Sequence, residues 1–255
     1  MIKLSVVIIT FNEEKNIERC LNSVREIADE IIVLDSFSTD KTEEICKKYN
    51  VKFFLHKFDG YTSQKNRAVT FAENDYVLSL DADEVLSEKL INSIKQIPEN
   101  QPFDAYDFNR LNIYCGKPIK HTSWYPDKKI RLWNKNKGKW EGDKIHEIVK
   151  IKKNAETGFL KGDLLHFSYN SIEEHIAQAN KFSTVRAEEY FNKNKSLLLL
   201  KAIFAPQYHF IRNYFIKFGF LEGYYGFIIS CIIAFEVFLK YVKAFHLSRN
   251  KTFGS

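Results

Sequence analysis

The sequence predicts an α/β protein in which a mixed, mainly parallel sheet is flanked by helices and followed by a helical, amphipathic C-terminal appendage. In the first 100 residues, short β-branched runs alternate with segments of helical periodicity, the pattern of right-handed βαβ units. Beyond residue 195 the chain instead becomes rich in aromatic, aliphatic and basic residues. A chain of 255 residues is long enough to bury one full core and carry such an appendage.

The composition is that of a globular intracellular protein. Hydrophobic residues make up 45% and charged residues 27%, which disfavours wholesale disorder. The four cysteines are scattered without a C-x-x-C pair, so a disulfide framework or zinc site is disfavoured and a reducing cytosol is favoured. The apolar start of the chain lacks the cleavage site of a signal peptide and is interpreted as a strand.

The first strand is predicted over Leu4–Thr10, a β-branched run of buried character. Asn12 is expected to cap the next helix, in which Ile17, Leu21 and Val24 recur at helical spacing. The alternation then continues with a strand over Ile31–Leu34 that ends at Asp35, a helix capped by Thr39 or Asp40, a strand over Val51–Leu55 and a helix over Gln64–Phe71.

The fourth strand, Tyr76–Leu80, runs directly into Asp81, Asp83 and Glu84. Ligands bind at the carboxyl edge of open α/β sheets, and clustered carboxylates there suit Mg²⁺ or Mn²⁺ holding a phosphate. The alternative is a solvated acidic turn that caps a helix beginning near Ser87.

Strands one, two and four all end in polar or acidic residues, which predicts a nucleotide site at one sheet edge. The residues concerned are Thr10 with Glu13, Asp35 with Asp40, and Asp81 with Asp83. Neither G-x-G-x-x-G nor G-x-x-x-x-G-K-[ST] occurs, so metal and side chains must meet the phosphate charge. Lys65 and Arg67 are the nearest cationic candidates, with a solvated helix face as the alternative.

From Phe103 the alternation ends, and shorter extended segments predict a smaller mixed sheet that carries the second substrate. These segments are Phe103–Tyr114, Lys129–Trp133, Ile145–Ile151 and Leu164–Tyr169. His146, Glu147 and His166 lie within them, although neighbours in a strand point to opposite faces.

A helix follows from Ser171 to about Asn192, where Ser171 and Glu174 form a capping box. Beyond Lys195, charges interrupt every apolar run before it reaches the roughly 18 residues of a membrane span. Basic and aromatic residues together favour helices that lie in one leaflet of a membrane. The alternative is packing against the catalytic domain or, in a homodimer, against a second copy.

Three motifs, in this order, resemble those of family 2 glycosyltransferases of GT-A fold, over roughly residues 4 to 150. They are Thr10-Phe11-Asn12-Glu13-Glu14, Asp35-Ser36-Phe37-Ser38-Thr39-Asp40-Lys41-Thr42 and Asp81-Ala82-Asp83-Glu84. Further stretches resemble the bacterial lipopolysaccharide core β-glucosyltransferase subgroup: Trp124-Tyr125-Pro126-Asp127, Arg131-Leu132-Trp133, His146-Glu147, Arg212-Asn213-Tyr214 and Gly219-Phe220-Leu221-Glu222-Gly223.

The resemblance implies inverting transfer of a hexose, with glucose the best candidate, from a nucleotide sugar such as a UDP-sugar to a lipid-linked envelope acceptor. Asp35 would contact the base, Asp81 the ribose or diphosphate, and Asp83 a divalent Mn²⁺ or Mg²⁺. The other donor contacts would come from Thr10, Asn12, Glu13, Lys65 and Arg67. Glu147 would be the catalytic base, with Asp127 in reserve, and His146 or His166 would complete the metal shell.

This interpretation assigns residues 1–195 to a GT-A catalytic domain and 196–255 to a membrane-associating segment. Within the catalytic domain, residues 1–100 form the nucleotide-sugar half and 101–170 the acceptor half. The protein is expected in the cytoplasm, peripheral on the inner face of the cytoplasmic membrane.

Two other functions fit parts of the sequence. Asp81 and Asp83, followed by Val85, match the nucleophile motif of haloacid dehalogenase-type phosphatases, but that motif normally follows a first strand. A non-catalytic membrane-surface binding protein is the second alternative. Nucleic-acid binding ranks lowest, because the cations of the C-terminal region lie among apolar residues.

Overall fold

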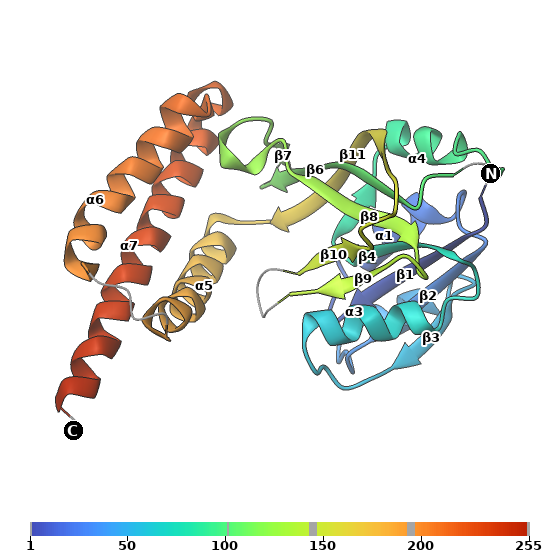
Figure 1. Ribbon diagram of the computed structural model, residues 1–255, viewed down its shortest axis with the longest axis horizontal. Helices are drawn as coiled ribbons and strands as arrows, with labels where there is room; N and C mark the ends of the chain where they lie inside the picture. Colours follow the sequence, from blue (N-terminus) through green and yellow to red (C-terminus); the bar gives the residue numbers. More distant parts are fainter. Residues whose placement is uncertain (1, 101, 143–146, 193–196, 254–255) are drawn as a thin grey trace. The chain divides into compact units, whose positions relative to one another are not determined.

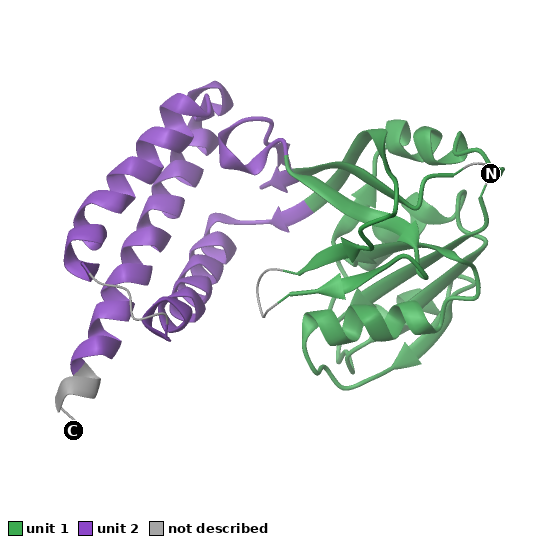
Figure 2. Ribbon diagram, viewed as in Figure 1, with its two compact units in different colours: residues 1–111, 127–166 green, residues 112–126, 167–255 purple. Residues whose placement is uncertain are grey.

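The computed structural model describes residues 2–100, 102–142, 147–192 and 197–253 (Figure 1). The chain forms two compact units (Figure 2). The first unit comprises Met1–Leu111 and Asp127–His166, and the second comprises Asn112–Pro126 and Phe167–Ser255.

A mixed sheet crosses the first unit, as the predicted fold class requires. Its strands are β1 (Leu4–Thr10), β2 (Glu30–Asp35), β3 (Lys52–Leu55), β4 (Tyr76–Asp81), β5 (Glu84–Leu86), β6 (Ala105–Tyr114), β7 (Lys117–Pro118), β8 (Lys128–Asn134) and β11 (Thr157–Tyr169). The spatial order is β3-β2-β1-β4-β8-β6-β11-β5, with β7 paired to β6. Strands β3, β2, β1 and β4 run parallel, whereas β8 is antiparallel to β4.

Helices cover both faces of the sheet because β1 is apolar on both. The helices of this unit are α1 (Ile17–Val24), α2 (Thr42–Cys46), α3 (Tyr61–Thr70) and α4 (Glu88–Lys95). Val6 and Ile8 pack with α1 and α4, and Val7 on the opposite face packs with α3. The antiparallel hairpin of β9 (Gly138–Glu141) and β10 (Ile148–Ile151) covers the face that carries α3.

Two local expectations are wrong. Most of the second half does not form a separate smaller sheet: β6, β8 and β11 join the main sheet, because β8 pairs with β4 at an edge that would otherwise leave backbone groups unpaired, and only β9 and β10 form a sheet of their own. Asn12 does not cap a helix either: it adopts a left-handed conformation, with φ 55°, and α1 begins only at Ile17.

The second unit is mostly helical. Besides β7 and the last three residues of β6 and of β11, its elements are η1 (Thr122–Trp124), α5 (Ile172–Asn192), α6 (Leu198–Ile211), the π-helical turn η2 (Arg212–Ile216), η3 (Gly219–Glu222) and α7 (Tyr224–Phe253). Ser171 caps α5 as predicted, since Glu174 N donates to its Oγ at 3.2 Å. The capping box is only half formed, because the Glu174 carboxylate accepts from Asn170 N, at 2.7 Å, and not from Ser171 N. Helix α5 falls in the same unit as the C-terminal helices, together with Asn112–Pro126.

Helix α7 contains an apolar stretch, Tyr224–Arg249, that is long enough to cross a membrane. Its best 18-residue window has a mean hydropathy of 1.8 and at most two charged residues. The test rests on length and composition alone, which the core helix of a soluble protein can also satisfy.

Candidate active site

The predicted meeting of three strand ends is confirmed. Thr10 lies in register with Asp35 of β2, and its neighbour Ile9 lies in register with Asp81 of β4. Because these strands are parallel, the side chains that close them lie at one carboxyl edge, where α/β sheets bind ligands. Thr10 and Asp35 are buried at that edge.

The loops after β1 and β2 are joined by hydrogen bonds. Asn12 N donates to Ser38 Oγ at 2.8 Å, and Thr39 N donates to Asn12 Oδ1 at 2.8 Å. Glu13 N donates to Thr42 Oγ1 at 2.8 Å. Asn12 and Glu13, both predicted donor contacts, therefore also hold the second loop in place.

The Asp35 carboxylate is oriented by the loop that follows it. It accepts hydrogen bonds from Ser38 N, at 2.8 Å, and from the Ser38 hydroxyl. Ser36 N donates to Thr10 O at 2.9 Å, so the end of β2 is also tied to the end of β1. Asp35 is thus a fixed acceptor with little freedom to reorient.

Asp81 lies between two cations at the end of β4. Lys65 Nζ donates to its carboxylate at 3.0 Å, and Arg131 approaches the same group at 3.7 Å. Burial alone would raise the pKa of Asp81, but Lys65 and Arg131 lower it to about 2. The carboxylate is therefore ionised throughout the physiological pH range, with 29% of its side chain exposed.

Two residues outside the predicted site hold these cations. The centroid of the Trp140 ring lies 4.5 Å from Lys65 Nζ and 4.8 Å from the Arg131 guanidinium carbon. Arg131 also pairs with the fully buried Glu84 at 3.2 Å, and Glu84 accepts a hydrogen bond from Asp81 N at 3.0 Å. Glu84 of the acid-rich motif is thus paired inside the protein. Trp140 has no sequence signal, because no local pattern marks a buried ring as a platform for cations.

Asp83 and His166 lie side by side, with 3.2 Å between Asp83 Oδ2 and His166 Nε2. Both side chains are partly exposed, at 25% and 21%. A carboxylate oxygen beside an imidazole nitrogen is a donor pair that suits Mn²⁺. Among the described residues, no group of three His, Cys, Asp or Glu side chains could hold a metal ion, and His146 lies outside those residues.

Further acidic charge gathers near Asp83. Burial raises the pKa of Glu13, and the charges of Asp83 and Asp40 raise it further. Burial lowers the pKa of Arg19, while the charges of Asp83 and Glu13 act in the opposite direction. Glu13, Asp83 and Arg19 therefore lie close enough to interact electrostatically.

Glu147 lies within electrostatic range of Tyr61 and Arg131. Burial raises the pKa of Tyr61, and the charges of Asp81 and Glu147 raise it further. Burial lowers the pKa of Arg131, but Glu84 and Asp81 raise it overall and Glu147 adds to the rise. The charge of Glu147 therefore acts on both Tyr61 and Arg131.

Two predicted site residues have partners of their own. Asp127 forms ion pairs with Arg110 at 2.8 Å and with Lys129 at 3.0 Å. Arg67 pairs with Asp59 at 3.1 Å. The carboxylate of Asp127 is therefore already engaged by two cations.

Comparison with known proteins places this geometry in context. Residues 5–153 match the sequence model of a family described as "Glycosyl transferase family 2". An uncharacterised glycosyltransferase of Rickettsia typhi is 34% identical over 97% of this chain and 88% of its own length. The lipopolysaccharide core biosynthesis glycosyltransferase LpsC of Rhizobium meliloti is 28% identical over 95% of this chain and 92% of its own length. Among solved structures, S. aureus TarS 1-349 aligns with a TM-score of 0.47 at 16% identity, over 98% of this chain and 92% of that one.

Proposed function

Because the chain belongs to glycosyl transferase family 2, we propose that it moves a hexose, with glucose the best candidate, from a UDP-sugar to a lipid-linked cell-envelope acceptor such as the lipopolysaccharide core. The observation that carries the donor proposal is the Asp81 carboxylate, which is paired with Lys65 at the carboxyl edge of the sheet. Asp35 lies on the other side of β1 from Asp81, and Asp83 lies beside His166. The acceptor proposal is supported by the similarity to LpsC along nearly the whole chain.

In this proposal the donor lies across the ends of β2, β1 and β4. Asp35 accepts a hydrogen bond from the base, and Asp81 accepts one from the ribose or faces the diphosphate. Lys65 supplies positive charge near the diphosphate, in a position held by the Trp140 ring. Thr10, Asn12, Glu13 and Arg67 remain predicted donor contacts, although Arg67 must leave Asp59 to serve as one.

Asp83 and His166 would hold the divalent cation, Mn²⁺ or Mg²⁺, with His146 as a further predicted ligand. A bound cation would offset the negative charge of the leaving diphosphate. The donor set fits this role, because it combines a carboxylate oxygen and an imidazole nitrogen that are both accessible.

Glu147 is the proposed base. Its carboxylate would take the proton of the acceptor hydroxyl while the hydroxyl oxygen bonds to the anomeric carbon and the bond from that carbon to the diphosphate breaks. A single displacement of this kind inverts the configuration at the anomeric carbon. Because the acceptor is lipid-linked, the reaction would take place at the inner face of the cytoplasmic membrane.

Calorimetric titration tests the donor proposal. UDP, GDP and their sugar conjugates would be titrated, with and without Mn²⁺, into the wild-type protein, Asp83→Ala and the control Asp75→Ala. Asp75 is exposed and precedes β4, at the end of that strand remote from Asp81. We expect Mn²⁺-dependent binding of UDP or a UDP-sugar that Asp83→Ala loses and Asp75→Ala keeps. A folded wild-type protein that binds none of these nucleotides would contradict the proposal.

A further inference from the structure

We propose that the connection between α6 and α7 docks into the headgroup layer of an anionic phospholipid bilayer, while α7 stays packed within the second unit and does not cross the bilayer. This inference deepens the proposed function, because a lipid-linked acceptor would be met at such a surface. Its evidence comes from the second unit alone.

The connection, with the adjoining ends of α6 and α7, exposes an unusual concentration of large apolar side chains. Each member of this group, here called the apolar tip, exposes between 44% and 68% of its surface. The apolar tip consists of Ile211, Phe215, Ile216, Phe218, Phe220, Leu221, Tyr224 and Phe227. Exposed apolar side chains normally occur singly, and a contiguous group of them marks an interaction site.

Two polar side chains of the same connection, Asn213 and Glu222, face inward. Asn213 is fully buried, and its Oδ1 accepts a hydrogen bond from Ser123 N at 3.0 Å. Glu222 accepts a hydrogen bond from Lys120 N at 2.9 Å and lies 2.6 Å from His121 Nδ1. The connection is therefore amphipathic, with Asn213 and Glu222 directed to residues 120–123 and the apolar side chains directed outward.

Close backbone packing holds the apolar tip in this arrangement. A Cβ atom on Gly219 would lie 2.6 Å from Asn213 O, and one on Gly226 would lie 1.8 Å from Gly219 O. Only glycine fits at these two positions. The outward side chains are thus presented by a rigid scaffold, and little ordering is required when they dock.

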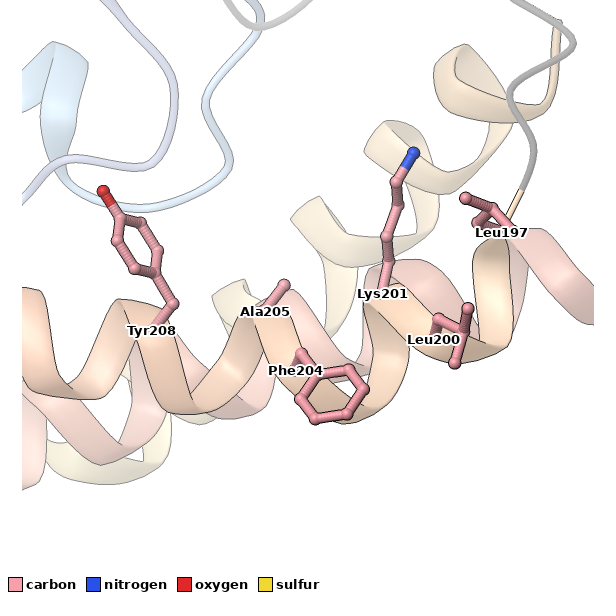
Figure 3. Close-up of a pocket in the computed structure, with 6 residues that line it drawn as sticks. All are labelled: Leu197, Leu200, Lys201, Phe204, Ala205 and Tyr208. Carbon is pink, nitrogen blue, oxygen red and sulfur yellow. The ribbon is translucent and has the colours of Figure 1, made fainter.

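A shallow groove extends the apolar surface along α6. It has a volume of about 360 Å³ and is lined by Leu197, Leu200, Lys201, Phe204, Ala205 and Tyr208 (Figure 3). In Figure 3 the Lys201 ammonium and the Tyr208 hydroxyl extend to the same side of the helix, and Leu200 and Phe204 lie away from them. Such a division between polar ends and apolar bodies suits the boundary between headgroups and acyl chains.

Charge selects the bilayer over a second copy of the chain. Residues 197–221 contain no Asp or Glu, whereas Lys201, Arg212 and Lys217 are cationic. A symmetric self-association through this surface would bring like charges together. An anionic membrane surface instead attracts each cation, and amphipathic aromatic rings favour the headgroup depth.

Helix α7 makes polar contacts that a spanning helix would have to break. Glu236 forms an ion pair with Arg186 of α5. Lys243 Nζ donates to Asn180 O and to Ser183 Oγ, each at 2.8 Å. To cross the bilayer, α7 would need either to lose these partners or to carry the charged α5 into the hydrocarbon, which is costly.

Vesicle sedimentation with the full-length protein tests the inference. The vesicles would contain phosphatidylcholine with or without phosphatidylglycerol. The tip variant is Ile216→Ser/Leu221→Ser, and the control is Leu55→Ser/Ile176→Ser, which removes two exposed apolar side chains elsewhere. We expect the tip variant to lose about tenfold in affinity for anionic vesicles, the control to bind as the wild type does, and high salt to weaken binding.

Alkaline carbonate should release the bound wild-type protein, whereas resistance to extraction would show that α7 spans the bilayer and would overturn that part of the proposal. If the tip variant and the wild type bound vesicles equally, the assignment of the apolar tip as the docking surface would be overturned. The membrane proposal would also be overturned by a different pair of results. These are a wild-type protein that does not bind vesicles and a dimer, seen by light scattering, that the tip mutations abolish. UDP binding, measured in parallel, distinguishes failure of the docking proposal from failure of the proposed function. The tip variant should bind UDP as the wild type does. If no variant binds UDP, that result counts against the proposed function alone.

Discussion

Lys65 and Arg131 show how two cations packed against one buried aromatic ring can set the charge of a carboxylate. Both cations lie against Trp140, and both act on Asp81. Burial of Arg131 is balanced by its ion pair with Glu84. The resulting arrangement keeps Asp81 ionised and directs positive charge toward the carboxyl edge of the sheet.

Glu147→Gln tests the base assignment at the scale of one residue. Glutamine keeps the shape of the side chain but cannot accept a proton, so we expect transfer to fall by at least about 100-fold while the Kd for the donor stays unchanged. The measurement combines initial rates of sugar transfer with calorimetric donor binding. The matched variant Asp127→Asn should transfer at close to the wild-type rate, because Arg110 and Lys129 already occupy that carboxylate. A normal rate in Glu147→Gln would remove Glu147 as the base.

At the scale of elements, α3 holds the hairpin of β9 and β10, whose two strands lie before and after Glu147 in the sequence. Asn66 Nδ2 donates to Trp140 O at 2.9 Å, and Trp140 N donates to Asn66 Oδ1 at 3.0 Å. Thr62 Oγ1 adds a bond to Gly142 O at 3.2 Å. The helix that carries Lys65 is thus linked directly to β9, and through the pairing of β9 with β10 to the strand that begins beside Glu147.

We expect Asn66→Ala to separate catalysis from donor binding. Loss of both bonds leaves the backbone groups of Trp140 without their partner, at a cost of about 1–3 kcal/mol, and frees the hairpin. The rate of transfer should fall about tenfold or more with little change in donor Kd, since Lys65 and Asp81 keep their own pairing.

The control for that experiment is Thr70→Ala, an exposed position on the same helix. Asn66→Asp, which keeps only the acceptor, should give an intermediate rate. An equal loss of donor affinity and of rate in Asn66→Ala would place this residue in the donor pocket and not in hairpin positioning.

At the scale of the whole molecule, the two units have separate cores. The second unit is centred on Tyr114, Ile119 and Ile229. His175 lies within the same unit, stacked on Tyr169 at 4.4 Å between ring centroids, with its Nδ1 3.2 Å from Tyr114 Oη. Only 3% of His175 is exposed, and burial lowers its pKa from 6.5 to about 4.

This burial makes the stability of the second unit depend on pH. Because the unfolded chain takes up the proton at a higher pH than the folded one, stability is full above about pH 6.5 and declines as the pH falls toward 4. The loss approaches ~3 kcal/mol for a shift of this size. Denaturation curves across this range should show the decline in the wild type and in the exposed-site control His246→Asn, but not in His175→Phe. The same pH slope in His175→Phe would contradict the role of His175.

Much of the first unit follows from local pattern. Leu4–Thr10 is a strand over the predicted residues, and Ser87 caps α4, because hydrophobic periodicity and capping depend on near neighbours in the chain. The placement of Asp35, Asp81 and Thr10 at one edge was predictable for the same reason: alternating strands and helices dictate parallel neighbours. The junction of β8 with β4 was not, since pairing across some 50 residues leaves no local signal.

The sequence by itself determined the α/β class, the carboxyl-edge acids and the apolar, basic character of the C-terminal segment. Only the tertiary structure decided which charges are paired and which are available. It placed Arg131 against Glu84, Asp127 between Arg110 and Lys129, and Asp83 beside His166. It also turned Asn213 and Glu222 inward and left the apolar tip exposed. The physical reason is that hydrophobic periodicity is a property of neighbouring residues, whereas the pairing of a charge depends on partners that the fold brings from distant parts of the chain.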